Sequence, residues 1–285
     1  MSRAVVFDAG TAAARTQIIS YPIPHLFASS KNEVLVQFLA APINRVDLML
    51  LDGQYPIRPK HHFENKLVPG FDGCGVVLAS TSPGFSKGDM VIPRDLGLGT
   101  WRTHAVLPAG SLIGLPAATP PLAGALLRSG ALIAWLLLHE VRALQEGDAV
   151  IVSAGTSTVA WFLVQLARLR HVSVFLVVRD RDPDELKDVR ERLLGLGAAA
   201  VISESELRAS LAGEAPTPAC LPVRPTMALD SVFGPVGQLL VETLAPGGPL
   251  SWLACWVDTG LISRSIRDIS STGSCLFSLS GAQNL

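Results

Sequence analysis

A short turn rich in hydroxyl side chains follows an apolar run in the second half of the sequence. The run "GDAVIVSAG" has the pattern of a buried strand, and "TSTVAWFLVQLARLR" after it has the length of a helix. A helix start presents free backbone N–H groups, and the helix dipole favours an anion there. The candidate contacts to a pyrophosphate are Gly155, Thr156, Ser157, Thr158 and Val159. Since this turn has one glycine rather than a full G-x-G-x-x-G, an ordinary helix cap stays open as an alternative.

Alternating charges follow the next apolar run, "VSVFLVV". The segment "VVRDR" places Arg179, Asp180 and Arg181 at the end of the second strand, where a dinucleotide-binding fold meets the adenosine ribose. An acidic residue there favours NAD, whereas arginine accommodates the additional phosphate of NADP through paired hydrogen bonds. In the context of a strand, helix and strand, the two arginines favour NADPH as cofactor. The alternative is a solvated charged turn.

Cysteine and histidine spacing indicates no metal site. The four cysteines lie far apart in the sequence, at Cys74, Cys220, Cys255 and Cys275. They form no C-x-x-C pair, and no cysteine–histidine cluster has the spacing of zinc ligands. The only adjacent histidines, His61 and His62, would point to opposite sides of an extended backbone.

Two patterns of elements divide the chain of 285 residues, which is long enough for two domains. Up to about residue 120, short Val- and Ile-rich runs alternate with Gly and Pro turns, which is typical of a small β-barrel or sandwich. From residue 121, strand-length and helix-length runs alternate, which favours a doubly wound parallel sheet. We expect an α/β protein with a β-rich domain over 1–120, a nucleotide-binding domain over 121–256 and a poorly ordered tail over 257–285, with a short helix near 261–269.

Charge and hydropathy limit the partners. The formal net charge of −1 gives no electrostatic reason to expect nucleic acid or an anionic membrane. The longest apolar run, "GALIAWLLL", is well short of the ~20 residues that span a bilayer. The first residues enter a strand pattern at once, so we expect no signal or transit peptide. From the sequence alone, either the location is cytoplasmic or a targeting segment is missing from this chain.

Four stretches carry a family resemblance: "APINRVDLMLLDGQYPIRP", "VIPRDLGLGTWRTHAV", the segment from "VVRDR" to "SESEL", and "ALDSVFG". Together they resemble the mitochondrial 2-enoyl thioester reductases, which are zinc-free members of the medium-chain dehydrogenase/reductase superfamily. The resemblance implies a GroES-like barrel followed by a Rossmann-type sheet. It also implies NADPH-dependent reduction of trans-2-enoyl-CoA or enoyl-acyl carrier protein in fatty acid synthesis, and a mitochondrial location.

The resemblance also implies roles for residues of the first domain. The family's proton donor falls on Tyr55, which would protonate C2 after hydride arrives at C3. Tyrosine, with an ordinary pKa near ~10, is a credible acid toward an enolate. Asn44, with Asp47, would fix the loop that presents Tyr55. Trp101 would form a wall of the substrate cleft or only pack, and Arg102 would be structural or bridge the domains.

Departures from the family keep other functions open. Gly130 stands where the family has a cofactor-contacting asparagine, and Thr158 and Ala160 stand where it has glycines of the phosphate turn. After residue 256 the sequence lacks the family's strand that pairs across the dimer and its segment that returns to the first domain, so we expect impaired activity and no family homodimer. The alternatives are a quinone or enone reductase of the same superfamily and a catalytically inactive NADPH-binding homologue.

Overall fold

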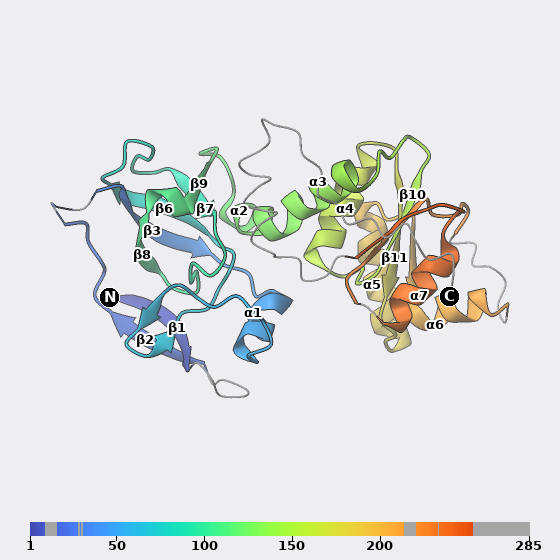
Figure 1. The fold of residues 1–285 in the computed structure, drawn as a ribbon, viewed down its shortest axis with the longest axis horizontal. Coiled ribbons are helices and arrows are strands. Elements are labelled where there is room, and N and C mark those ends of the chain that lie inside the picture. Colours follow the sequence, from blue (N-terminus) through green and yellow to red (C-terminus); the bar gives the residue numbers. More distant parts are fainter. Residues whose placement is uncertain (9–15, 28, 30, 214–220, 233, 253–285) are drawn as a thin grey trace. The chain divides into compact units, whose positions relative to one another are not determined.

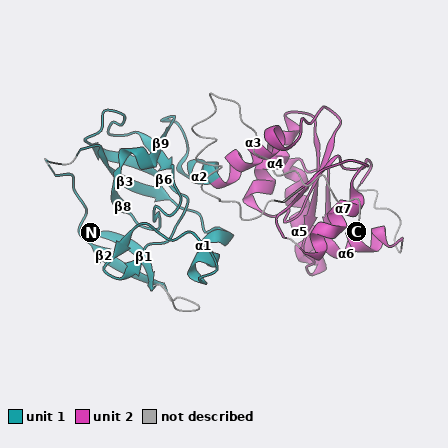
Figure 2. Cartoon of the chain, in the orientation of Figure 1, with its two compact units in different colours: residues 1–128, 257–269 teal, residues 129–256, 270–285 magenta. Residues whose placement is uncertain are grey.

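A computed structural model describes residues 1–8, 16–27, 29, 31–213, 221–232 and 234–252. The described chain forms two compact units that divide between Arg128 and Ser129 (Figure 2). The expected tail over 257–285, with its helix near 261–269, lies outside the described residues.

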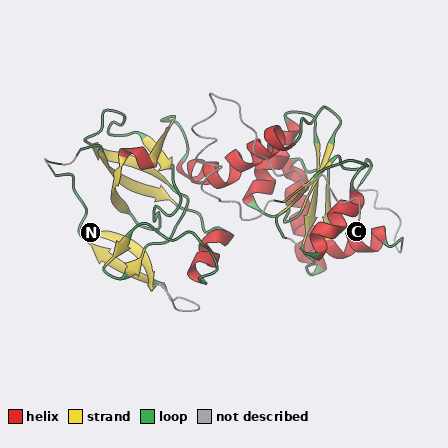
Figure 3. Ribbon diagram, viewed as in Figure 1, coloured by secondary structure: helices red, strands yellow, loops and turns green. Residues whose placement is uncertain are grey.

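The first unit is built of two antiparallel sheets with few helices (Figures 1 and 3). The five-stranded sheet runs in the order β8 (His104–Pro108), β3 (Glu33–Ala40), β6 (Cys74–Ser80), β7 (Met90–Pro93) and β9 (Leu112–Leu115). The four-stranded sheet runs in the order β2 (Gln17–Tyr21), β1 (Ser2–Asp8), β5 (Lys66–Leu67) and β4 (His62–Phe63). Helix α1 (Arg45–Leu51) follows β3, a short 3₁₀ helix (Ala109–Ser111) links β8 to β9, and α2 (Pro121–Leu126) closes the unit.

The larger sheet of this unit encloses an aliphatic core. Val34 and Val36 alternate along β3 and are fully buried, as the period of two in a strand requires. They pack with side chains from four neighbouring elements: Val77, Val91, Leu98, Ala105, Leu107 and Leu112. Burial of each such side chain contributes roughly 1.5–3 kcal/mol toward folding, so these short strands persist despite the many glycine turns between them.

The second unit is a parallel sheet with helices on both faces. Its strand order is β12 (Ala200–Ser203), β11 (Ser173–Val178), β10 (Ala149–Val152), β13 (Met227–Asp230) and β14 (Leu250–Trp252). Every pairing between these strands is parallel. The helices that connect them are α4 (Thr158–Arg168), α5 (Pro183–Leu196), α6 (Glu204–Leu211) and α7 (Pro235–Thr243). The predicted α/β fold, a β-rich unit followed by a doubly wound sheet, is confirmed.

Alternate residues of each central strand pack on opposite helix layers. In β10, Val150 and Val152 join the cluster that contains α4 and Leu193 of α5. Ala149 and Ile151 join the other cluster, with side chains from α6 and α7. Because both faces are covered, β10 is apolar throughout and β11, β12 and β13 are apolar except at one end, which is why the sequence shows them as continuous hydrophobic runs.

Capping residues define the boundaries of two helices. Gly197 ends α5 with φ of 110°, a left-handed conformation that glycine adopts without strain. At the start of α6, Ser203 Oγ accepts from Glu206 N, and the Glu206 side chain accepts from Ser203 N in return. This reciprocal pattern is the capping box that the sequence "SESEL" predicts.

A long helical run follows β9. It comprises α2, a π-helical stretch (Leu127–Leu132), α3 (Ile133–Leu136) and a second π-helical stretch (Leu137–Val141). The run Pro121–Val141 has 21 residues and a mean hydropathy of 1.6, so by length and composition it is able to cross a membrane. The uninterrupted apolar stretch "GALIAWLLL" is shorter than this helical run, so the sequence underestimates the length of the helix. Part of the run is used in packing, since Ala125 joins a core cluster of the first unit and Ala134 one of the second, whereas Leu122 and Trp135 are exposed.

Candidate functional site

The predicted phosphate turn follows β10 and passes close to β11. Gly155 N donates to Val177 O at 2.9 Å. A β-carbon at Gly155 would lie 2.8 Å from Leu176 Cβ, closer than real side chains approach, so only glycine fits here. Ala154 before it has φ of 48°, which makes the turn sharp. These contacts fix the backbone that leads into the next helix.

Helix α4 begins at this turn with free donors. Ser157 is its N-cap, and Ser157 Oγ accepts from Ala160 N at 3.2 Å. The N–H groups of Thr158 and Val159 lie in the first helical turn, where no intrahelical acceptor exists for them. The structure thus brings Thr156 and these residues to one helix start, as the sequence predicts. The cap does not exclude an anion at this helix start, because the serine satisfies one donor only.

Gly130 and Thr158, two departures from the family pattern, pack against each other. A β-carbon on Gly130 would lie 2.9 Å from Thr158 Cγ2, so the threonine methyl group fills the space that a larger residue at 130 would need. Ala160 is fully buried in the cluster beneath the sheet, so its β-carbon points into the core. The methyl group of Ala160 therefore occupies core space and not the surface of the turn.

A buried serine–aspartate contact joins the phosphate turn to the neighbouring strand. Ser153 Oγ donates to Asp230 Oδ1 at 2.6 Å and accepts from Ser231 N at 2.8 Å. Asp230 Oδ1 also accepts from Val232 N. These residues lie at the carboxyl ends of β10 and β13, where the strand order reverses and where open α/β sheets bind ligands. This pair is not predicted from the sequence. The only local indication is the single acid that ends the strand "MALD".

The charged segment after β11 lies next to the same turn. Arg179 is exposed, whereas Arg181 is held by two contacts, from Nε to Glu185 Oε1 at 2.8 Å and from Nη1 to Arg179 O at 3.0 Å. Asp180 Oδ1 accepts from Ser205 N and Oγ, and the Ser205 hydroxyl is the main cause that lowers the pKa of this carboxyl. The acid of the segment is thus engaged with α6, and the exposed Arg179 presents positive charge.

Tyr55 follows α1 and is buried in the first unit. Its side chain is 6% exposed and packs in a cluster with Phe7, Leu50, Phe71 and Leu96. The ring meets that of Phe71 edge to face, with centroids 5.3 Å apart and planes at 69°. The partly buried side chains Met49 and Ile57 pack against the cluster.

A polar network connects α1 to the segment that carries Phe71. Asn44 is the N-cap of α1; its backbone N–H donates to Asp47 Oδ2 at 2.8 Å, and its Nδ2 donates to Asp72 Oδ2 at 3.0 Å. Asp47 Oδ1 accepts from Phe71 N at 3.1 Å. Asp72 forms an ion pair with Arg128, and both side chains are at most 3% exposed. Asn44 and Asp47 therefore hold the start of the helix that precedes Tyr55.

Burial dominates the titration of Asp47. It raises the pKa of Asp47 from 3.8 to about 6. Hydrogen bonds from Asn44 N and Phe71 N act in the opposite direction, the negative charge of Asp72 adds to the increase, and Arg128 reduces it. Asp47 consequently changes charge near neutral pH, unlike an ordinary surface aspartate.

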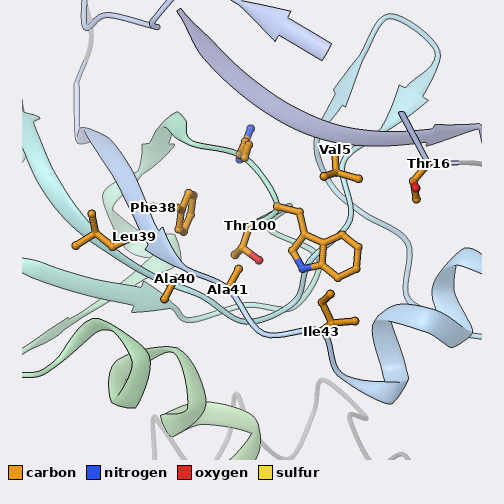
Figure 4. A pocket seen from close by; sticks show the side chains of 10 residues that line it. Val5, Thr16, Phe38, Leu39, Ala40, Ala41, Ile43 and Thr100 are labelled. Atoms are coloured by element: carbon orange, nitrogen blue, oxygen red, sulfur yellow. The ribbon is translucent and has the colours of Figure 1, made fainter. Parts of the chain in front are cut away.

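Trp101 lines an open hollow on the first unit, of about 420 Å³ (Figure 4). Its Nε1 donates to Pro42 O at 3.1 Å, and a β-carbon at Gly70 would lie 2.8 Å from Trp101 N, so this loop requires a glycine. Figure 4 shows Phe38 and Leu39 on one side of the hollow and Val5 and Thr16 on another. The other lining residues are Ala40, Ala41, Ile43, Thr100 and Arg102. The surface is mostly apolar.

Arg102 is structural within the first unit. It is 5% exposed, and its Nη2 donates to Leu98 O at 2.9 Å. Burial lowers the pKa of its guanidinium to about 10, and the neighbouring Tyr21 acts in the opposite direction. Arg102 thus braces the glycine-rich loop that presents Trp101.

Among the residues that the structure describes, no group of three His, Cys, Asp or Glu side chains is arranged to hold a metal ion. Cys74 is buried in its reduced form, and the other three cysteines lie outside the described residues.

The geometry is matched by comparisons with known proteins. Residues 30–117 match the family model described as the alcohol dehydrogenase GroES-like domain. The chain is 37% identical over 231 residues to the mitochondrial enoyl-[acyl-carrier-protein] reductase of Rattus norvegicus. That alignment covers 79% of this chain and 58% of the rat protein. Residues 30–117 belong to the GroES-like domain family, and the longer alignment shows that both units are similar to enoyl reductases of the medium-chain dehydrogenase/reductase superfamily.

Solved structures of the superfamily agree in fold. A mitochondrial 2-enoyl thioester reductase heterodimer from Candida tropicalis matches with a TM-score of 0.73 and 26% identity, covering 88% of this chain and 74% of that one. The Etr1p complex with NADP and crotonyl-CoA matches with the same TM-score and identity, covering 87% and 74%. The chain thus spans less than two thirds of the rat relative and about three quarters of these structures.

The pKa of Asp47 predicts a pH-dependent stability. Because its folded pKa of about 6 exceeds the unfolded value, its contribution is present at pH 4.5 and lost as the pH rises through 6. The change amounts to about 2 kcal/mol between pH 4.5 and 7.5. Asp47→Asn removes this titration, so its destabilisation should be about 2 kcal/mol smaller at pH 7.5 than at pH 4.5. Urea unfolding of both proteins at the two pH values measures this, and an equal or larger cost at pH 7.5 would contradict it.

Proposed function

We propose that the chain is an NADPH-dependent reductase of trans-2-enoyl thioesters, acting on enoyl-CoA or enoyl-acyl carrier protein in fatty acid synthesis. The observation that carries the proposal is that one chain combines a candidate cofactor site with a candidate proton donor. The chain has a Rossmann-type turn beside Arg179 and Arg181 and a buried Tyr55 behind a capped helix. Its relatives named as enoyl reductases, and the solved complex with NADP and crotonyl-CoA, support the substrate class. The names of these relatives also support a mitochondrial location.

Residues of the second unit would hold the cofactor. The free N–H groups at the start of α4 face where a pyrophosphate would bind, and Gly155 allows the backbone to approach it. Arg179 would contact the 2′-phosphate, with Arg181 held beside it by Glu185. Bound NADPH supplies a hydride to C3 of the enoyl thioester.

Tyr55 would complete the reaction by donating its phenolic proton to C2. A tyrosine is protonated at neutral pH and is a suitable acid toward an enolate. Since the ring is 6% exposed, we expect the acyl chain to displace partly buried neighbours such as Met49 and Ile57 on binding. The apolar hollow beside Trp101 is suited to an acyl chain, and we propose it as part of the substrate surface.

Two other functions give different outcomes in one assay. A quinone or enone reductase would oxidise NADPH with a quinone but not with crotonyl-CoA. An inactive homologue would bind NADPH and oxidise it with neither substrate. The packing of Thr158 against Gly130 and of Ala160 into the core favours an intact cofactor turn. Crotonyl-CoA and a quinone, assayed side by side with NADPH, distinguish the three functions.

The role of Tyr55 is tested by removing its hydroxyl. Tyr55→Phe keeps the edge-to-face packing on Phe71 but removes the proton donor, so kcat for crotonyl-CoA should fall by roughly 10²–10⁴-fold with the NADPH dissociation constant unchanged. Tyr21→Phe, which alters the other tyrosine of the chain, is the matched control and should retain kcat. An undiminished kcat in Tyr55→Phe would exclude this tyrosine as the acid.

Cofactor selectivity is tested at the two arginines. Arg179→Ala or Arg181→Ala should weaken NADPH binding by about 1.5–3 kcal/mol, the range of a charge-assisted hydrogen bond, and leave NADH binding nearly unchanged. Lys187→Ala on the exposed side of α5 controls for the loss of one positive charge. Fluorescence titration with both cofactors measures the effect. Equal losses for NADPH and NADH would show that neither arginine recognises the 2′-phosphate.

A further inference from the structure

The most deeply buried ion pair among the described residues lies in the first unit. Arg128 Nη2 lies 2.7 Å from Asp72 Oδ1, and Arg128 Nε donates to the same oxygen at 3.0 Å. The two side chains are 3% and 2% exposed. By contrast, the Lys60–Asp95 pair of the same unit has side chains that are 60% and 42% exposed.

Arg128 and Asp47 hold the peptide groups on the two sides of Phe71. Arg128 Nη2 donates to Phe71 O at 2.9 Å, while Phe71 N donates to Asp47 Oδ1. Thr100 Oγ1 donates to Asp72 O at 2.6 Å. The backbone of residues 71–72 is thus held by three side chains from three separate segments of the chain.

These contacts connect Arg128 to two neighbours of Tyr55, the Phe71 ring and helix α1. One is the Phe71 ring, which contacts the Tyr55 ring edge to face. The other is α1, because Asp72 Oδ2 accepts from Asn44 Nδ2 at the start of that helix. Arg128 lies in a different segment, on the π-helical stretch after α2, and these intermediates link it to Tyr55.

The arrangement is costly if its only purpose is stability. Burying two charges removes their hydration, and apolar residues of similar size often replace such pairs without loss of stability. Arg128 Nη1 is also buried and has no hydrogen-bond partner among the described residues, which adds to the cost. A guanidinium forms directional hydrogen bonds, here through Nε and Nη2, and so fixes the geometry of its partners. An apolar side chain does not do this.

We propose that Arg128 is a positioning residue: with Asp72 it fixes the Phe71 peptide and thereby the orientation of the Tyr55 ring for proton transfer to the substrate. The catalytic part of this inference rests on the proposed function. The structural part, that the pair sets the environment of Tyr55, does not require activity.

The test replaces both charges at once. Arg128→Met with Asp72→Asn removes both charges of the pair together, so neither is left without the other, and the new amide oxygen can still accept from Asn44 Nδ2. The matched control is Lys60→Gln with Asp95→Asn, which removes the exposed pair of the same unit. Both are made with and without Tyr55→Phe, and thermal melting identifies the variants that are folded.

The first readout needs no substrate. With ring-¹³C tyrosine in a Tyr21→Phe background, the NMR signal comes from Tyr55 alone. We expect it to shift or broaden in the Arg128/Asp72 variant and to stay unchanged in the control. If the double variant fails to fold, Arg128→Lys retains a charge beside Asp72 but removes the guanidinium fork, and the same shift is expected there. A folded variant with an unmoved Tyr55 signal overturns the proposal.

The second readout is kinetic. We expect kcat for crotonyl-CoA to fall by roughly 10–100-fold in the Arg128/Asp72 variant, with little change in the NADPH dissociation constant. In the Tyr55→Phe background the same replacement should add less than about a threefold loss, because the effect acts through that hydroxyl. A full additional loss there overturns the positioning role. One outcome separates the two proposals: the Tyr55 signal moves in the Arg128/Asp72 variant, but the wild-type chain has no reductase activity. That outcome would refute the proposed function and leave the structural inference standing.

Discussion

The ion pair between Arg128 and Asp72 connects segments of the first unit that are distant in the sequence. An unpaired charge at either position would be strongly unfavourable in this buried setting, so each residue requires the other. The same carboxylate reaches Asn44 at the start of α1, and the same guanidinium reaches the peptide of Phe71. The environment of Tyr55 therefore depends on a contact that Tyr55 itself does not make.

The second unit depends on a different constraint, which is close packing of parallel strands. Gly155 passes β11 so closely that a β-carbon has no room, and this places the start of α4 beside the residues that follow β11. The buried Ser153–Asp230 hydrogen bond fixes the turn from the side of β13. A backbone held on both sides suits an anion site, because its donors are oriented before a ligand arrives.

Local patterns in the sequence predict much of this second unit. Strands buried on both faces appear as continuous apolar runs, and the Ser203–Glu206 box and Gly197 mark helix ends through chemistry confined to a few residues. The positions of Arg179 and Arg181 follow from the end of β11 in the same way.

The parts that the sequence did not predict are long-range contacts. Arg128 and Asp72 are 56 residues apart, and neither stands in a local motif that indicates a partner. Ser153 and Asp230 are 77 residues apart. Trp101 was expected on a glycine turn, but the hollow it lines includes side chains from β1 and β3 that only the folded unit brings together. Pairings of this kind depend on tertiary structure, which periodicity and capping do not report.

The central claim is that one chain directs a hydride to C3 and a proton to C2 of an enoyl thioester. The most direct measurement is the position of deuterium in the product of crotonyl-CoA reduction, determined by NMR and mass spectrometry. With NADPH deuterated at the transferring position of C4 in ordinary water, we predict one deuterium at C3. With unlabelled NADPH in D₂O, we predict one deuterium at C2. In Tyr55→Phe, we predict that this incorporation at C2 is much slower. No labelled butyryl-CoA in either experiment, or deuterium from D₂O at C3, would contradict the account.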